Sequence, residues 1–152
     1  LRMAMNVEMV DVPYKGAGAA LADVVAGQVP IVFSSPLGTV PLIRSGRLRA
    51  LAVSGTQRMT ALPEVPTIAE AGVSGFDVPV WYGVSAPAGT PRPLIDGWNK
   101  AINRVLDNAE FKAALLLLGA QPVSMSPTEW SGAVRVDLKR WERVVRMSGM
   151  AA

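Results

Sequence analysis

The chain has 152 residues, of which 50% are hydrophobic and 18% are charged, a composition typical of a globular protein with a sizeable core. It contains no histidine and no cysteine, which excludes a thiolate nucleophile, a Cys-ligated zinc site and a Ser-His-Asp triad built from this chain alone. The net charge is only +3. Basic residues become dense only near the C-terminus, where acidic residues are interleaved with them, whereas a nucleic-acid surface normally shows a basic patch with aromatic stacking partners, so no nucleic-acid partner is expected.

The first half alternates between predicted strands and helices. Short strands are expected at 7–12, 29–33 and 48–53, of which 29–33 is continuous, apolar and β-branched, as a strand buried on both faces should be. Helices are expected at 17–26 and 39–45, ended by Gly27 and Gly46 respectively. This alternation predicts an α/β fold with a parallel-rich sheet flanked by helices. The first six residues are too short for a signal peptide, and we expect the chain to begin within a fold.

The second half is punctuated by prolines and then becomes helical. The capping-box sequences 67–70 and 126–129 each predict the start of a helix. Thr90 is expected to cap a helix that Pro91 begins. The elements expected in this half are extended segments at 76–80 and 81–86, a short helix closed by Gly72, a long helix with an apolar stripe at 94–106, a helix at 110–118 ended by Gly119, and a last helix with an apolar stripe at 130–145.

The turn Tyr14-Lys15-Gly16-Ala17-Gly18 carries the most informative pattern. It joins a predicted strand to a predicted helix, so it presents backbone N–H groups at the positive end of a helix dipole, where a carboxylate is stabilised. The Tyr14 hydroxyl is a possible donor, Lys15 adds charge, and Gly16 and Gly18 let a ligand approach the backbone. The alternative is an ordinary βα loop whose glycines serve tight turning.

Three further residues are candidates for ligand contacts. Ser34 and Ser35 follow the expected strand 29–33, at the edge of the sheet where ligands bind in open α/β folds. Their hydroxyls suit a carboxylate, although capping of the next turn explains one of them equally well. Trp81, in the sequence Trp81-Tyr82-Gly83, suits the wall of a pocket, although core packing is the commoner role of such aromatics.

Other chemistries find little support in the sequence. The turn lacks the Gly-Lys-Ser/Thr of a P-loop, and Leu21 stands where a Rossmann motif needs its third glycine. The carboxylates lie on different predicted elements, so no metal site, no acid–base pair and no cofactor are expected. No run of about 18 apolar residues predicts a transmembrane helix.

Read together, these segments resemble the Bug family, the TctC-like receptors of tripartite tricarboxylate transporters. The resemblance runs nearly end to end, and the order and spacing of its motifs make it specific. The motifs that carry it are Val12-Pro13-Tyr14-Lys15-Gly16, Gly27-Gln28-Val29, Leu42 to Val53, Leu62 to Gly72, Trp81-Tyr82-Gly83, Ala86 to Pro91 and Leu118-Gly119-Ala120-Gln121-Pro122.

The resemblance implies a two-lobed receptor of the periplasmic-binding-protein type II kind. Such receptors are typically secreted to the periplasm and present a di- or tricarboxylate, an amino acid or an aromatic acid to a membrane permease, without catalysis. In the family, one ligand carboxylate is held largely by main-chain donors and ordered water. Family members often carry an aspartate at the position of Ser34, and its absence favours an acid without an amino group. The ligand contacts expected here are Tyr14, Gly16, Ala17, Gly18, Ser34, Ser35 and Trp81.

The resemblance covers only the C-terminal half of the family's mature chain. By analogy, residues 1–80 supply the second ligand-binding lobe, and residues 81–152 cross back and supply the C-terminal helices of an incomplete first lobe. Those helices would lack the sheet that they cover, so their apolar stripes predict self-association.

Two rival functions remain. One is a truncated remnant that binds no ligand and only self-associates. The other is an enzyme centred on Tyr14 and Lys15 or on Ser34, which is the weakest reading because no base is spaced to activate a serine.

Overall fold

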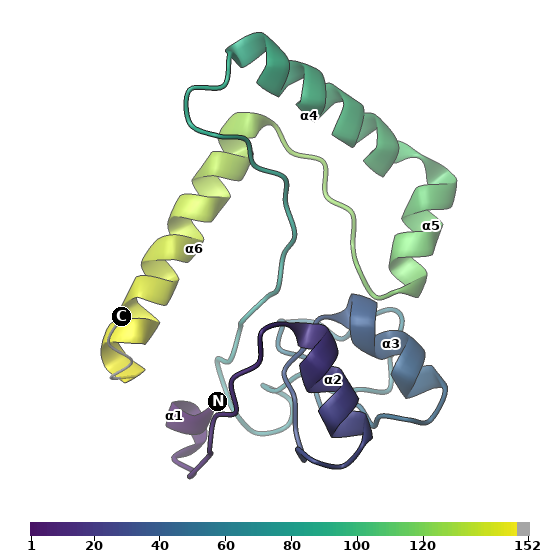
Figure 1. Cartoon of the computed structure of the whole chain (residues 1–152), viewed down its shortest axis with the longest axis vertical. Helices are drawn as coiled ribbons and strands as arrows, with labels where there is room; N and C mark the ends of the chain where they lie inside the picture. Colours follow the sequence, from purple (N-terminus) through teal and green to yellow (C-terminus); the bar gives the residue numbers. More distant parts are fainter. Residues whose placement is uncertain (149–152) are drawn as a thin grey trace. The chain divides into compact units, whose positions relative to one another are not determined.

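The computed structural model describes residues 1–148, which form helices joined by long irregular segments (Figure 1). The helices at 17–26 and 110–118 and the last helix were predicted to within a residue or two, whereas α1 was not predicted and α3 begins three residues earlier than expected. The helices are α1 (Arg2–Met5), α2 (Ala17–Val25), α3 (Pro36–Arg44), α4 (Arg92–Asp107), α5 (Ala109–Leu117) and α6 (Pro127–Ser148).

Glycines follow three of these helices, as the sequence predicted. Gly27, Gly46 and Gly119 come after α2, α3 and α5 with φ angles of 77°, 73° and 78°. Beyond α2, the backbone N–H of Gln28 donates to the carbonyl of Asp23 at 2.8 Å, so the chain turns back on the last helical turn. Only glycine adopts this left-handed conformation without a steric cost, which explains why each helix ends there.

Both predicted capping boxes form. The N–H of Ser126 donates to Glu129 Oε2 at 2.8 Å, and the N–H of Glu129 donates to Ser126 Oγ at 3.2 Å, immediately before and within the first turn of α6. The same reciprocal pair joins Thr67 and Glu70, at 2.7 Å and 3.0 Å. There it opens only a series of turns, so the short helix predicted after residue 67 is absent.

The predicted cap of α4 is wrong. Thr90 Oγ1 donates to the carbonyl of Pro87 at 2.8 Å, so Thr90 closes the turn that precedes the helix. Pro91 occupies the N-cap position of α4, and no side chain caps this helix.

The predicted parallel-rich sheet is absent from residues 1–148, so the α/β class is corrected to a mainly helical structure. The segments 7–12, 29–33, 48–53 and 76–86 are irregular. The only β pairs described are isolated bridges, Val53 with Thr67 and Met59 with Leu62. A helix closes its hydrogen bonds locally, whereas a strand exists only beside a second strand. Val10, which is 93% exposed, shows how open these apolar segments are.

The described chain divides into two compact units. Unit 1 comprises 1–82 and 113–121, and unit 2 comprises 83–112 and the residues from 122 onward. The core of unit 1 centres on Val40, which is fully buried, with Leu62 and Val65. The partly buried side chains that pack against this core are Ile43, Ala50, Val53, Met59 and Ala61.

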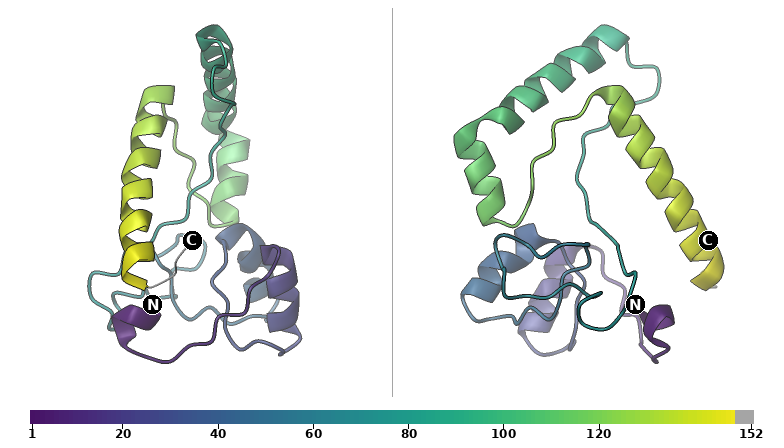
Figure 2. Two further views of the ribbon diagram at one scale, coloured as in Figure 1. Left: turned by 60° about the vertical axis from the view of Figure 1, so that its left-hand side comes forward. Right: turned by 180° about the vertical axis from the view of Figure 1, so that it is seen from behind.

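Unit 2 contains two long helices, α4 and α6, which are in contact with each other and run in different directions (Figure 2). The Nδ2 groups of Asn99 and Asn103 donate to the carbonyl of Met125 at 2.8 Å and 3.2 Å, which ties α4 to the segment before α6. The indole ring of Trp130, in the first turn of α6, lies on the backbone of Gly83.

Candidate ligand-binding site

The predicted binding turn leads directly into α2. Tyr14 Oη donates to Asp23 Oδ2 at 2.6 Å, so the turn is tied to the side of the helix that it opens. This hydrogen bond, with some desolvation and the charge of Asp23, raises the pKa of Tyr14. The phenolic proton stays on Tyr14 and is donated to Asp23, so the phenol oxygen keeps only acceptor capacity toward a ligand. Asp23 was not anticipated from the sequence, because the contact depends on how the turn folds back on α2.

The N-terminus of α2 is open. Gly16 occupies the N-cap position with an extended backbone (φ 174°) and supplies no side-chain acceptor. The first backbone N–H groups of a helix, here from Ala17 onward, have no partner within the helix. Both Gly16 and Gly18 border open space, since a Cβ added at either would meet nothing within 4 Å. The N-terminus of α2 therefore has free backbone N–H donors, the positive end of the helix dipole and open space for an anion.

The N-terminus of α3 also lacks a side-chain cap, but it offers fewer free donors, because Pro36 has no N–H and the N–H groups of Gly38 and Thr39 donate to Ser35 O at 3.3 Å. Ser35 is the N-cap residue, yet its hydroxyl makes no capping bond, and Thr39 Oγ1 donates to the Ser35 carbonyl at 3.0 Å. Ser34 Oγ is buried without a hydrogen-bond partner. A buried hydroxyl left unpaired costs on the order of 1–3 kcal/mol, so such a group favours a bound molecule that pairs with it.

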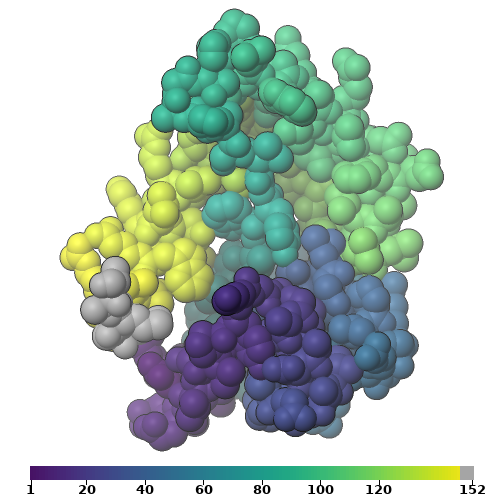
Figure 3. Space-filling view, viewed as in Figure 1, coloured from purple at the N-terminus to yellow at the C-terminus, as the bar shows by residue number. Residues whose placement is uncertain are grey.

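The two open N-termini lie at the same end of a helix pair. α2 and α3 run side by side and begin at the same end (Figure 1), and their side chains meet in the space-filling view (Figure 3). Their contact is close, because Leu21 Cδ1 lies 3.1 Å from where a Cβ on Gly38 would be. The positive dipole ends of both helices therefore face the same region of unit 1.

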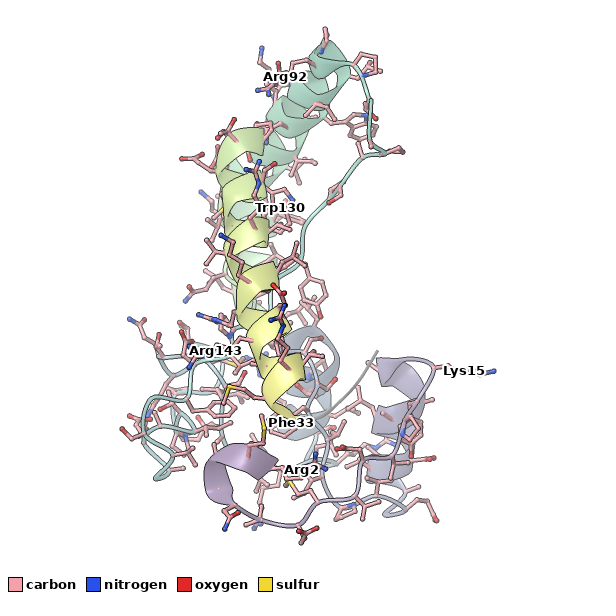
Figure 4. The ribbon with its side chains drawn as sticks, turned by 90° about the vertical axis from the view of Figure 1, so that its left-hand side faces the viewer. Arg2, Lys15, Phe33, Arg92, Trp130 and Arg143 are labelled. Carbon is pink, nitrogen blue, oxygen red and sulfur yellow. The ribbon has the colours of Figure 1, made fainter. Side chains whose placement is uncertain are left out.

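The predicted site residues are only partly brought together. Six of them flank the N-termini of α2 and α3: Tyr14, Gly16, Ala17, Gly18, Ser34 and Ser35. Trp81 lies in the extended segment near the end of unit 1 and is 47% exposed. The side chain of Lys15 extends away from the ribbon (Figure 4), so it does not turn back toward the open donors of α2.

An apolar hollow of about 530 Å³ lies along α2 and α3. Gly18 is the only predicted site residue among those that line it, and Arg47 is its only charged one. The remaining lining residues are Leu21, Ala22, Val25, Ala26 and Leu42.

Residues 1–148 contain no group of three or more acidic, His or Cys side chains able to hold a metal ion. Within the same range no helix is long and apolar enough to cross a membrane.

Uncapped helix N-termini beside a buried hydroxyl are features that suit an anion. The chain belongs to the tripartite tricarboxylate transporter receptor family, TctC, whose family model matches residues 1–150. The family is one of receptors and not of enzymes, in line with the absence of catalysis expected from the sequence.

Curated relatives support the same membership. The chain is 38% identical over 141 residues to a UPF0065 protein of Pseudomonas sp. strain P51 and 37% identical over 149 residues to protein BugT of Bordetella pertussis. It covers 42% and 45% of these two proteins, and so spans less than half of their length. It covers 83% of a shorter UPF0065 protein of Pseudomonas knackmussii, at 36% identity.

Solved structures of receptors are also similar. A protein of R. palustris solved with adipate matches at a TM-score of 0.92 and 34% identity, over 97% of this chain and 50% of that one. The periplasmic binding protein BugD matches at 0.90 and 31%, over 97% and 50%. MatC from Rhodopseudomonas palustris, with bound malate, matches at 0.88 and 35%, over 95% and 50%. The resemblance to the Bug family is thereby confirmed, for half the length of these receptors.

Proposed function

We propose that this chain belongs to a periplasmic solute-binding receptor that holds a small organic acid and delivers it to the permease of a tripartite transporter. The observation that carries the proposal is the pair of uncapped helix N-termini of α2 and α3, with the buried unpaired hydroxyl of Ser34 beside one of them. The open backbone N–H donors at the start of α2, together with the positive dipole ends of both helices, stabilise a carboxylate without any charged side chain.

The expected ligand is a di- or tricarboxylate or an aromatic acid without an amino group. Support comes from two relatives of known structure, one with adipate and one with malate. The position of Ser34 carries a neutral hydroxyl, so an ammonium group placed there would have no counter-charge. Tyr14, Gly16, Ala17, Gly18, Ser34, Ser35 and Trp81 are the residues proposed to contact the ligand.

Thermal-shift measurements test this function directly. Adipate, malate and benzoate are expected to raise the melting temperature of the folded chain, because a ligand that binds only the native state stabilises it. Adipamide and malamide, which keep the shape but remove the charge, serve as matched controls and are expected to have no effect. A folded sample that responds to none of the acids contradicts the proposal.

A second candidate is a chain that self-associates and binds no ligand. The observation that favours it is the apolar surface of unit 2, where Trp98 on α4 is 69% exposed and Leu138 on α6 is 64% exposed. Side chains of this size rarely remain open to water in a monomer. Association without any response to carboxylates identifies this second candidate.

A further inference from the structure

The turn that follows α5 packs onto the first turn of α3. A Cβ built on Gly119 would overlap Met59 Cε and would lie 3.0 Å from Pro36 Cβ and 3.4 Å from Val40 Cγ2. All four residues belong to unit 1, because the chain returns to this unit over residues 113–121. The backbone of Gly119 is therefore in contact with the N-terminal end of α3.

Two separate requirements make residue 119 a glycine. Its φ of 78° ends α5 in the left-handed conformation, with Gly119 N–H donating to Leu116 O at 3.0 Å and Ala120 N–H to Leu115 O at 2.9 Å. Gly46 meets the same conformational requirement after α3, yet a Cβ there would meet nothing within 4 Å. Of these two helix-ending glycines, only Gly119 is in close contact with other residues. Its role in ending α5 does not explain this contact.

The contact reaches the proposed ligand site through Pro36. Pro36 is the first residue of α3, directly after Ser35, and Val40 one turn later is fully buried. The first turn of α3 is thus held between the core on one side and Gly119 on the other. Proline has a rigid ring and a fixed φ, so a displacement of Pro36 is transmitted along the backbone to Ser35 and Ser34. Binding groups tolerate misplacement of only about 0.5 Å.

We infer that Gly119 is a positioning residue for the ligand site, because its close approach to Pro36 sets where Ser34, Ser35 and the first N–H groups of α3 lie. This inference rests on the proposed function. It gives the turn after α5 a role in positioning the site, although the inference requires no contact between this turn and the ligand. Gly119 acts on the site through Pro36, which its backbone contacts.

The test compares Gly119→Ala with the matched control Gly46→Ala. Both variants force alanine into a left-handed conformation and both lose stability, but only Gly119→Ala displaces α3 at its N-terminus. Two readouts are taken in samples that circular dichroism shows to be folded. One is amide hydrogen exchange at Gly38 and Thr39, whose N–H groups both donate to Ser35 O at 3.3 Å. The other is the Kd for adipate and malate by calorimetry.

Gly119→Ala is expected to speed exchange at these two amides and to weaken dicarboxylate binding by about fivefold relative to Gly46→Ala. Adding Met59→Leu, which shortens the overlapping side chain but keeps an apolar residue of similar volume against the core, is expected to recover part of the affinity and keeps the variant testable if Gly119→Ala folds poorly. Equal exchange rates and equal Kd values in the two glycine variants overturn the inference. Absence of binding in the wild-type chain overturns the proposed function instead, and hydrogen exchange then still decides whether Gly119 positions α3.

Discussion

The indole ring of Trp130 lies directly on the backbone of Gly83, so that a Cβ added to Gly83 would overlap ring atoms Cζ2 and Cη2. Gly83 is the first residue of unit 2 along the chain, and Trp130 belongs to the first turn of α6. This contact therefore joins the start of unit 2 to its longest helix, and it depends on the absence of a side chain at residue 83.

Gly83→Ala is expected to lower the free energy of unfolding by about 1–3 kcal/mol, because a rigid indole ring has to move to admit the methyl group. Urea denaturation measures the loss. Gly97→Ala and Gly132→Ala are matched controls inside α4 and α6, where a Cβ would meet nothing within 4 Å. They are expected to stabilise by about 0.5–1 kcal/mol, through reduced unfolded-state entropy. Three glycine variants of equal stability would contradict the contact.

Ser34→Ala is expected to separate stability from binding. Removing a buried hydroxyl that has no partner leaves the free energy of unfolding unchanged or raises it. A ligand that pairs with this hydroxyl loses about 0.5–1.5 kcal/mol of binding free energy, or roughly two- to tenfold in Kd. The control is Ser45→Ala, at the other end of α3, where Oγ donates to Leu42 O at 3.1 Å. Unchanged affinity in Ser34→Ala would remove Ser34 from the site.

Glu70 makes the stability of unit 1 depend on pH. The hydrogen bond from Arg58, followed by that from the N–H of Thr67, lowers the pKa of Glu70 below its ordinary value. A carboxyl whose pKa is lower in the folded state stabilises it at pH values above the unfolded pKa, and this stabilisation is lost as the pH falls through the folded pKa. Glu70→Gln is therefore expected to be less stable than wild type near neutral pH.

The difference between Glu70→Gln and wild type should shrink on acidification, as followed by thermal melts between neutral pH and the acid range. Glu64→Gln, at an exposed position of the same segment, is the control for loss of one charge. A difference that stays constant across this range would mean that Glu70 is not held by these bonds.

The apolar stripe of α4 is expected to drive self-association. Leu94, Trp98 and Val105 lie on one face of α4 and are all exposed. Trp98→Lys is expected to shift the chain toward monomer, because a charge in an apolar interface is costly to bury. Val136→Lys on α6 is the control, since Val136 is equally exposed but lies among basic residues. Light scattering at micromolar concentration measures the effect, and a monomeric wild-type chain contradicts it.

Features with local causes were predictable from the sequence. The helices α2, α5 and α6, the glycines that follow α2 and α5, and the box formed by Ser126 and Glu129 all depend on residues within one or two turns of each other. The open N-terminus of α2 follows from the same local signals, because Gly16 has no side chain with which to cap it.

Features that depend on distant partners were not predictable. The segment 29–33 has the composition of a buried strand, yet strand pairing requires neighbours that composition does not specify. Two contacts likewise depend on how separate elements pack together. They are the hydrogen bond from Tyr14 to Asp23 and the contact of the Gly119 backbone with Pro36. The sequence predicted Gly119 only as the residue that ends a helix. Nothing in the sequence indicated its contact with Pro36.

The most direct test of carboxylate binding at the helix N-termini compares Gly16→Asp with Gly16→Asn by calorimetry with adipate and malate. Residue 16 has an extended backbone and open surroundings, so both side chains fit and both are good N-caps. Wild type and Gly16→Asn are expected to bind within a few-fold of each other. Gly16→Asp differs from Gly16→Asn only in its negative charge, which repels the ligand, and it is expected to bind at least about tenfold more weakly. Equal binding by the two variants would contradict a carboxylate held at the start of α2.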